Sequence, residues 1–191
     1  MSFTAAPSTG SSVMAAAAVG DTLGVRRNSA SAAATQRLLA EFQKKCETEL
    51  GPEGYAGLDV TSRVVTDTED WFTLRIDATE TMASGYEFSR LYHIDKATDQ
   101  TVTLKDLFRE DADYVTVLSG EVRRQMEEQM AQSEEVVYFP EEFTAIDPEQ
   151  NFYFNAEGEL VLVFDEYTIA SGATGMPEFA IPADAYETLL K

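Results

Sequence analysis

The sequence is poor in the residues that build disulfides, metal centres and membrane spans. Its 191 residues include one cysteine, Cys46, and one histidine, His93. A single cysteine excludes an intrachain disulfide and a zinc site built from cysteines, and a single histidine excludes metal sites built from several imidazoles. No window reaches the roughly 20 apolar residues that a membrane-spanning helix requires. Residues 13–19 are short, weakly hydrophobic and not preceded by a basic residue, so they make a poor signal peptide.

Basic residues are also scarce, and they are unevenly placed. The sequence has 14 lysines and arginines against 34 aspartates and glutamates, which gives a net charge of -20. The first 50 residues carry five basic and four acidic side chains, which leaves a net charge of -21 for residues 51–191. Such a surface repels nucleic acid and anionic lipid and favours rapid encounter with a basic protein. Charge alone is also compatible with an acidic surface that only aids solubility.

Motifs for catalysis are absent as well. His93 lies on an expected strand, and no serine sits in a GxSxG turn that would supply a nucleophile beside it, so we predict a structural role for this histidine. Asp165 and Glu166 are neighbours on a strand and point to opposite faces, which argues against a pair of catalytic carboxylates. The small-residue loop 171–175 lacks a GxGxxG or Walker pattern and leads into a strand. The sequence therefore predicts no catalytic residue, no metal ligand and no cofactor.

The chain divides into a leader and one domain. Residues 1–30 are rich in Ala, Ser, Thr and Gly without a sustained period, which predicts a flexible leader. From residue 31, apolar residues recur at spacings of three and four, and Gly51 and Pro52 end this predicted helix. Residues 31–191 are numerous enough to bury one core, so we expect a single folded domain there.

Three strand-like runs follow the first helix, at residues 60–68, 71–78 and 86–94. Turn-forming residues separate them, so an antiparallel meander is the simplest arrangement. The second run alternates, which places Phe72 and Leu74 on one face of the sheet and Arg75 on the other. A further short strand is expected at residues 101–104.

The clearest helical pattern comes next. Asp111 or Asp113 can cap this helix, and apolar residues repeat at spacings of three and four from Val115 to Met130. A long connection rich in glutamate and containing two prolines then leads to the second half of the sheet.

The most strand-like stretch lies between residues 151 and 182. Every residue from 160 to 164 is apolar, which predicts a strand buried on both faces. Residues 155–158 suit a hairpin turn that connects this strand to residues 152–154. After a loop of small residues, another strand is expected at 178–181.

The end of the chain completes the fold prediction. Asp184 is expected to cap a short closing helix. The order of the elements predicts an α+β fold, a mostly antiparallel sheet with helices packed on one side.

Two segments, residues 67–108 and 151–182, resemble the extracytoplasmic domain of RsiV-like anti-sigma factors. The resemblance extends over about residues 35–190, and the pattern FDEY…G…G.PEF in the second segment is fairly specific to this family. Its members hold an extracytoplasmic-function sigma factor through a cytoplasmic segment, cross the membrane with one helix, and use the outer domain as a receptor for lysozyme. Related outer domains also occur beside peptidoglycan deacetylase domains.

The resemblance implies a non-enzymatic sensor of the cell envelope. The expected partner is a basic protein such as lysozyme, with peptidoglycan as a further possibility. The sigma factor is expected to bind only a segment absent from this sequence. The resemblance also implies an extracytoplasmic location, with a membrane anchor in a segment that is likewise absent from this sequence. The alternative is a cell-wall-binding accessory module of a peptidoglycan-modifying protein. A hydrolase with acidic catalytic residues is a third class, which would need a deep pocket holding two convergent carboxylates.

Two loops at strand ends are the expected binding face, and Tyr86 and Met176 are the expected anchors because aromatic and methionine side chains are enriched in interface cores. The predicted binding residues are Met82, Ser84, Gly85 and Tyr86 in the first loop, and Ser171, Gly172, Ala173, Thr174 and Met176 in the second.

Overall fold

The α+β class predicted from the sequence is confirmed by the computed structural model, which describes residues 2–5, 22–50, 54–82 and 84–191. Within these residues the strands form two antiparallel sheets where we expected one. The first sheet has the order β1-β2-β3-β4-β5 and the second the order β6-β7-β8. The chain forms two compact units: Met1–Arg63 with Ile76–Glu87, and Val64–Arg75 with Phe88–Lys191.

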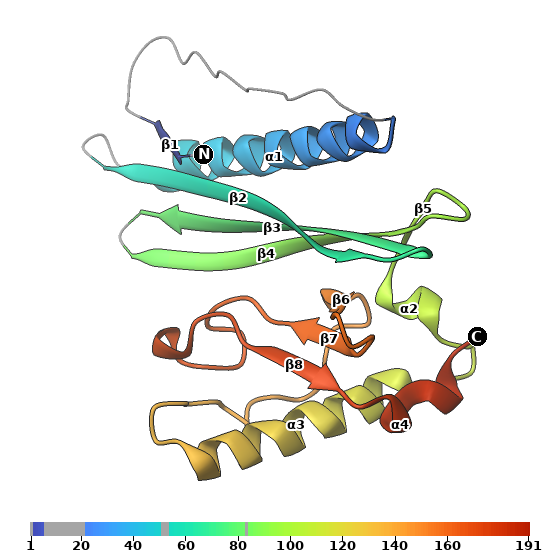
Figure 1. Ribbon diagram of the computed structural model, residues 1–191. Helices are drawn as coiled ribbons and strands as arrows, with labels where there is room; N and C mark the ends of the chain where they lie inside the picture. Colours follow the sequence, from blue (N-terminus) through green and yellow to red (C-terminus); the bar gives the residue numbers. More distant parts are fainter. Residues whose placement is uncertain (1, 6–21, 51–53, 83) are drawn as a thin grey trace. The chain divides into compact units, whose positions relative to one another are not determined.

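The first unit is built around helix α1 (Thr22–Glu49). It also contains parts of the long strands β2 (Ala56–Asp67), β3 (Trp71–Thr81) and β4 (Gly85–Asp95). Figure 1 shows α1 running along β2. Leu38 and Phe42 of α1 are buried because their spacing of four residues places them on one face of the helix. The helix is also tied to β3, since Lys45 Nζ donates a hydrogen bond to Glu80 Oε2 at 2.6 Å.

Structure begins earlier in the chain than we expected. Strand β1 (Ser2–Ala5) pairs antiparallel with β2, and α1 starts at Thr22 instead of residue 31. Both fall within the predicted leader. The other leader residues, 1 and 6–21, lie outside the described residues, and the domain boundary at residue 31 stays a prediction. Among the helices that the structure describes, none combines the length and hydrophobicity needed to cross a membrane.

The second unit is centred on the sheet of β6 (Phe152–Phe154), β7 (Leu160–Val163) and β8 (Glu178–Ile181). All four residues of β7 are buried, which confirms the prediction of a strand covered on both faces. The predicted hairpin is also confirmed, because β6 pairs antiparallel with β7. Its turn is closed by Gly158, which has a φ of 81° that glycine adopts readily.

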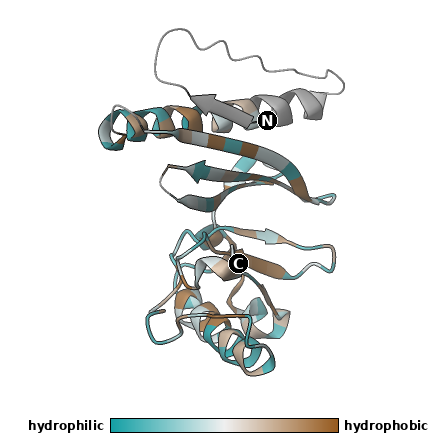
Figure 2. Cartoon of the chain, turned by 90° about the vertical axis from the view of Figure 1, so that its left-hand side faces the viewer, coloured by the Kyte–Doolittle hydropathy of each residue, from teal (hydrophilic) through white to brown (hydrophobic). Residues whose placement is uncertain are grey.

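Helix α3 (Tyr114–Gln132) covers one face of this second sheet (Figure 1). Its buried residues Leu118, Val122 and Met126 belong to the same hydrophobic core as the strands of the sheet. Figure 2 shows the hydrophobic colouring of these strands. The second unit therefore has a continuous apolar core between α3 and the sheet.

The other face of the second sheet meets the ends of β2, β3 and β4 that belong to the same unit. Thr66 Oγ1 on β2 donates to the carbonyl oxygen of Phe154 on β6 at 2.7 Å. Arg75 on β3 is only 3% exposed and forms an ion pair with Glu178 on β8. Glu178 also accepts a hydrogen bond from the hydroxyl of Tyr153 at 2.8 Å. The face of β3 opposite its apolar residues is therefore also buried.

Three short elements, a strand and two helices, differ in part from the predictions. Strand β5 (Gln100–Val102) is followed by helix α2 (Leu104–Leu107), where we expected the strand to continue to residue 104. The closing segment forms α4 (Ala183–Tyr186), whose N-cap is Pro182, so the predicted cap at Asp184 is wrong. The first turn is closed from Pro182, because the backbone N–H of Ala185 donates to the carbonyl of Pro182 at 3.0 Å.

The structure decides which aspartate caps α3. Asp113 is the N-cap, and its side chain accepts a hydrogen bond from the backbone N–H of Thr116 at 3.2 Å. Asp113→Ala should therefore lower the free energy of unfolding by about 1 kcal/mol, measured by urea denaturation. Asp111→Ala is the matched control, because its carboxylate is exposed and lies 3.8 Å from Arg109 Nε. Equal losses in the two variants would contradict the assignment of the cap.

Candidate binding site

The loop after β7 is held in place by a second stretch of chain. The backbone N–H of Phe139 donates to the carbonyl of Ile169 at 2.9 Å, and that of Ser171 donates to the carbonyl of Val137 at 3.0 Å. Between them, Tyr138 and Ala170 form an isolated antiparallel bridge. The loop is therefore fixed like a short strand before it reaches its small residues.

The small residues themselves form one turn of 3-10 helix, Gly172–Thr174. Thr174 N donates to the carbonyl of Ser171 at 2.9 Å, and Thr174 Oγ1 accepts from the backbone N–H of Val137 at 3.3 Å. Of these residues Ala173 is exposed, whereas the others are half-buried. The loop of small residues is therefore an ordered turn with part of its surface covered.

Tyr167 is the prominent side chain of this loop, and we did not identify it from the sequence. It is 56% exposed, and its φ of 63° places it in the left-handed region that residues other than glycine rarely adopt. Its ring lies over Gly172, where an added Cβ would be 2.6 Å from the ring. The absence of a side chain at position 172 therefore makes room for the ring of Tyr167.

Met176 is one of the two predicted anchors, and its role stays a prediction. It is half-buried, and its sulfur lies 3.5 Å from Ser89 Oγ on β4. Its side chain therefore contacts the neighbouring strand. Tyr167 offers more exposed surface at this loop.

The other predicted loop lies in the first compact unit, at the turn between β3 and β4. Ser84 and Gly85 are exposed, whereas Met82 and Tyr86 are half-buried. Met82 lines a hollow of about 320 Å³, whose other lining residues are Glu49, Leu50, Gly54 and Tyr55. The loop of residues 171–176 belongs to the second unit, whereas the loop of residues 82–86 belongs to the first. That the two loops form a single binding face stays a prediction.

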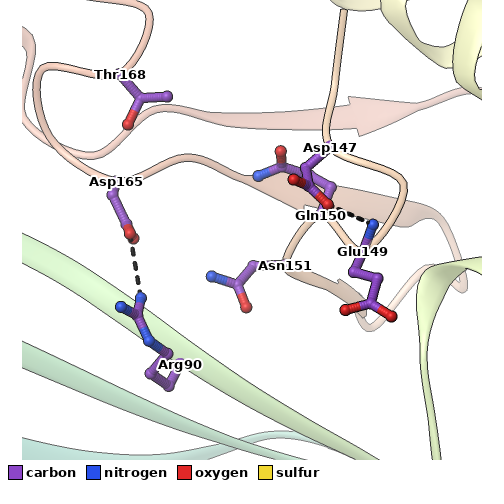
Figure 3. Close-up of a pocket in the computed structure, with 7 residues that line it drawn as sticks. All are labelled: Arg90, Asp147, Glu149, Gln150, Asn151, Asp165 and Thr168. Carbon is purple, nitrogen blue, oxygen red and sulfur yellow. Dashed lines mark hydrogen bonds and ion pairs between the residues drawn. The ribbon is translucent and has the colours of Figure 1, made fainter. Parts of the chain in front are cut away.

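A polar pocket of about 380 Å³ lies in the second unit, beside the start of the loop (Figure 3). We call it the acidic pocket, because it contains three carboxylates and one guanidinium. Its lining residues are Arg90, Asp147, Glu149, Gln150, Asn151, Asp165 and Thr168.

Hydrogen bonds to β4 hold one wall of the acidic pocket. Asp165 Oδ1 accepts from the backbone N–H of Ser89 at 2.8 Å, and Asp165 Oδ2 accepts from Arg90 Nη1 at 3.1 Å. Asn151 Nδ2 donates to the carbonyl of Ser89 at 3.0 Å. These side chains form hydrogen bonds with the backbone N–H and C=O groups of Ser89 at the edge of β4. Without them, the unpaired groups of an exposed edge could pair with another strand.

The carboxylates of the acidic pocket are partly engaged by neighbouring groups of the protein. Asp165 uses both oxygens to position β4 and Arg90. Asp147 accepts a hydrogen bond from the backbone N–H of Glu149 at 2.7 Å (Figure 3). In the described part of the chain, no group of three His, Cys, Asp or Glu residues is placed to hold a metal ion.

His93 is buried away from the pocket lining, and its predicted structural role is confirmed. It is 2% exposed, it stacks on Trp71 with ring centroids 4.7 Å apart, and its Nδ1 forms a hydrogen bond with Thr73 Oγ1. Burial lowers the pKa of His93 from 6.5 to about 4, because the imidazolium would lose its hydration. The ring is therefore neutral at physiological pH.

Comparison with known proteins agrees with the resemblance seen in the sequence. Residues 105–184 match a family described as a protein of unknown function, DUF3298. The chain is 35% identical over 161 residues to the anti-sigma-V factor RsiV of Bacillus subtilis, an alignment that covers 82% of this chain and 55% of that protein. The chain thus spans about half the length of this relative.

Two crystal structures share the fold. One is a DUF3298 family member from Bacteroides fragilis, with a TM-score of 0.58, 18% identity and coverage of 91% of this chain and 70% of that chain. The other is a DUF3298 family protein from Pseudomonas aeruginosa, with a TM-score of 0.55, 15% identity and coverage of 80% and 69%. At these identities they establish the fold alone.

Proposed function

We propose, from the premise that this chain is an RsiV-like extracytoplasmic domain of an anti-sigma factor, that it senses a basic cell-wall enzyme such as lysozyme and thereby controls an extracytoplasmic-function sigma factor. In this proposal the domain binds its ligand without catalysis. Membrane anchoring and sigma-factor binding belong to segments other than the ones described above.

The observation that carries the proposal is the charge of the domain. Residues 51–191 have a net charge of -21, and lysozymes of the animal type are basic. Complementary charge accelerates encounter and selects against acidic partners, although it contributes less to affinity than well-packed contacts do. The ordered loop 165–175 supplies a surface on which such contacts can form, because its backbone is fixed by hydrogen bonds to residues 137–139.

A cell-wall-binding accessory module is the second candidate. The acidic pocket supports it, because its volume lies within the range of small-molecule sites and its amide, hydroxyl and charged groups suit the hydroxyls of a sugar. In this case the ligand would be a peptidoglycan fragment.

Calorimetry on the full chain tests the first proposal. We expect saturable one-to-one binding to hen-type lysozyme that survives physiological salt, with a Kd of about 1 μM or tighter. An equally basic unrelated protein is the control, because generic attraction between opposite charges is screened at physiological ionic strength. Binding that the control shares, or that salt abolishes, would contradict the sensor function. Saturable binding of peptidoglycan fragments in its place would favour the accessory module.

A further inference from the structure

We infer that the packing around His93 is an acid-sensitive contact, which holds strand β6 against β3 and β4 while the imidazole ring is neutral and releases β6 when the ring takes up a proton. The released part is the β6 side of the second sheet, whereas α3 and the core beneath it stay folded. This inference concerns a movement within the second compact unit and does not depend on the identity of a ligand.

The ring of His93 contacts side chains from both sheets. On the first sheet, it stacks on Trp71 of β3, and its Nδ1 atom forms a hydrogen bond with Thr73 Oγ1. On the second sheet, the ring centroids of Phe152 and Phe154 lie 4.8 Å and 5.5 Å from that of His93. We call these five residues the His93 cluster. All of them belong to the second unit, and together they join β6 to β3 and β4.

The surroundings of the ring carry no charge among its described contacts. Besides β3 and β6, strand β5 contributes Val102, which lies opposite His93 in the register of the two strands. On the same strand as His93, Asp95 accepts hydrogen bonds from backbone N–H groups of the turn that follows. Burial alone lowers the pKa of His93 to about 4, without a contribution from a charged neighbour. The ion pairs between the strand ends and the second sheet are Arg75–Glu178 and Arg90–Asp165.

Protonation leaves the ring without the partners that a cation needs. Its Nε2 atom is buried and has no hydrogen-bond partner among the described residues. An imidazolium carries an N–H donor at each ring nitrogen, and a buried charge without a counter-ion is costly. The indole face of Trp71 attracts a cation, but it compensates only part of the lost hydration. Because Phe152 and Phe154 cover the ring from β6, a movement of β6 away from β4 lets water reach it.

The polar contacts on this side of the second sheet are single hydrogen bonds. Thr66 Oγ1 donates to the carbonyl of Phe154 at 2.7 Å, and Asn151 Nδ2 donates to the carbonyl of Ser89 at 3.0 Å. The backbone N–H of Ser89 donates to Asp165 Oδ1 at 2.8 Å. The opposite face of the sheet shares a continuous apolar core with α3. Separation at the His93 cluster therefore breaks fewer contacts than unfolding of the whole unit does.

The pH decides how often this contact opens. In the open state His93 is hydrated and titrates near its ordinary pKa of 6.5, whereas in the closed state its pKa is about 4. The open state therefore binds more protons between these values, so opening becomes more favourable as the pH falls. From about pH 7.5 to about pH 5, the equilibrium constant for opening should rise about 30-fold.

Amide hydrogen exchange of the full chain, followed by NMR, measures this opening. The N–H of Ser89 probes the contact because it donates to Asp165, and the N–H of Val122 within α3 probes global unfolding. We expect the protection of Ser89, corrected for the intrinsic exchange rate at each pH, to fall about 30-fold over this interval. At pH 5 it should be lower than that of Val122 by about tenfold or more. Equal protection of the two amides would overturn the inference, because it would show that the unit opens only as a whole.

The variant His93→Gln is the matched control, because glutamine is polar but does not titrate. In this variant the protection of Ser89 should change less than about threefold between the same pH values. Circular dichroism confirms that the variant is folded. A fall as large as that of wild type would overturn the role of His93.

The fluorescence of Trp71 supplies a test that needs only the wild-type chain. Trp71 is the single tryptophan of the sequence, and its ring centroid lies 4.7 Å from that of His93. An imidazolium quenches the emission of a neighbouring indole, so the emission follows the charge of His93. We expect quenching with a midpoint well below pH 6.5, toward 4. A midpoint near 6.5 would overturn the inference, because it would show that the ring is protonated freely while β6 stays in place.

Discussion

Replacing Glu178 with alanine should lower the free energy of unfolding by about 3 kcal/mol, because it removes the carboxylate that faces the buried guanidinium of Arg75. The cost lies at the low end for a buried ion pair, since the Glu178 side chain is 31% exposed and water reaches it. Tyr153 also loses the acceptor of its hydroxyl in this variant. Urea denaturation of the full chain, followed by circular dichroism, measures the change.

An exposed ion pair is the control for this prediction. Glu128 on α3 pairs with Arg124 at 3.0 Å, and both side chains are more than half exposed. Glu128→Ala should therefore cost less than about 1 kcal/mol. The double variant Arg75→Met/Glu178→Leu should recover most of the stability lost in Glu178→Ala, because it removes the buried charge together with its partner. A Glu178→Ala variant as stable as Glu128→Ala would contradict the buried pair.

Stability should also fall with acid through His93. The folded protein binds the proton only near its pKa of about 4, whereas the unfolded chain binds it near 6.5. The unfolded state therefore takes up more protons between these values, so stability is full above pH 6.5 and declines as the pH falls toward 4. Between about pH 7.5 and about pH 5, His93 should account for a loss of about 2 kcal/mol.

The groups around His93 explain why its environment favours the neutral ring. Trp71 and Thr73 of β3 and Phe152 and Phe154 of β6 are its described contacts, and none of these side chains is charged. The Nε2 atom is buried and has no hydrogen-bond partner among the described residues.

The comparison of wild type with His93→Gln isolates this effect, because the many carboxylates titrate in both proteins. Urea unfolding at the two pH values should show the additional loss in wild type only. The same pH dependence in both proteins would contradict the lowered pKa.

Several elements could be predicted because their signals are local. The hairpin between β6 and β7 follows from Asn155 and Gly158 in its turn, and α3 follows from its apolar spacing and an aspartate before its first turn. Helix α2 carried a signal that we did not use. Thr103 and Asp106 have the spacing of a capping box, and Asp106 Oδ2 accepts from Thr103 N at 2.9 Å.

The candidate site was predicted only in part. The small-residue loop stands out from its composition, and it is an ordered turn. Tyr167 was missed because no local pattern indicates a left-handed conformation for an aromatic residue. The acidic pocket was missed because its lining comes from three segments, around Arg90, Asp147 and Asp165, which are far apart in the chain.

The sequence by itself determined the α+β class, the main helices and strands and the acidity of the domain, because spacing, turn residues and charge act over short distances along the chain. The tertiary structure decided which segments cover each face of the strands. The second sheet covers Arg75 on β3 through Glu178, and its strand β6 covers His93 on β4 through Phe152 and Phe154. The alternation of residues along each strand could not indicate this burial. Burial depends on which distant segments pack together, and that packing also assembles the pocket beside Tyr167.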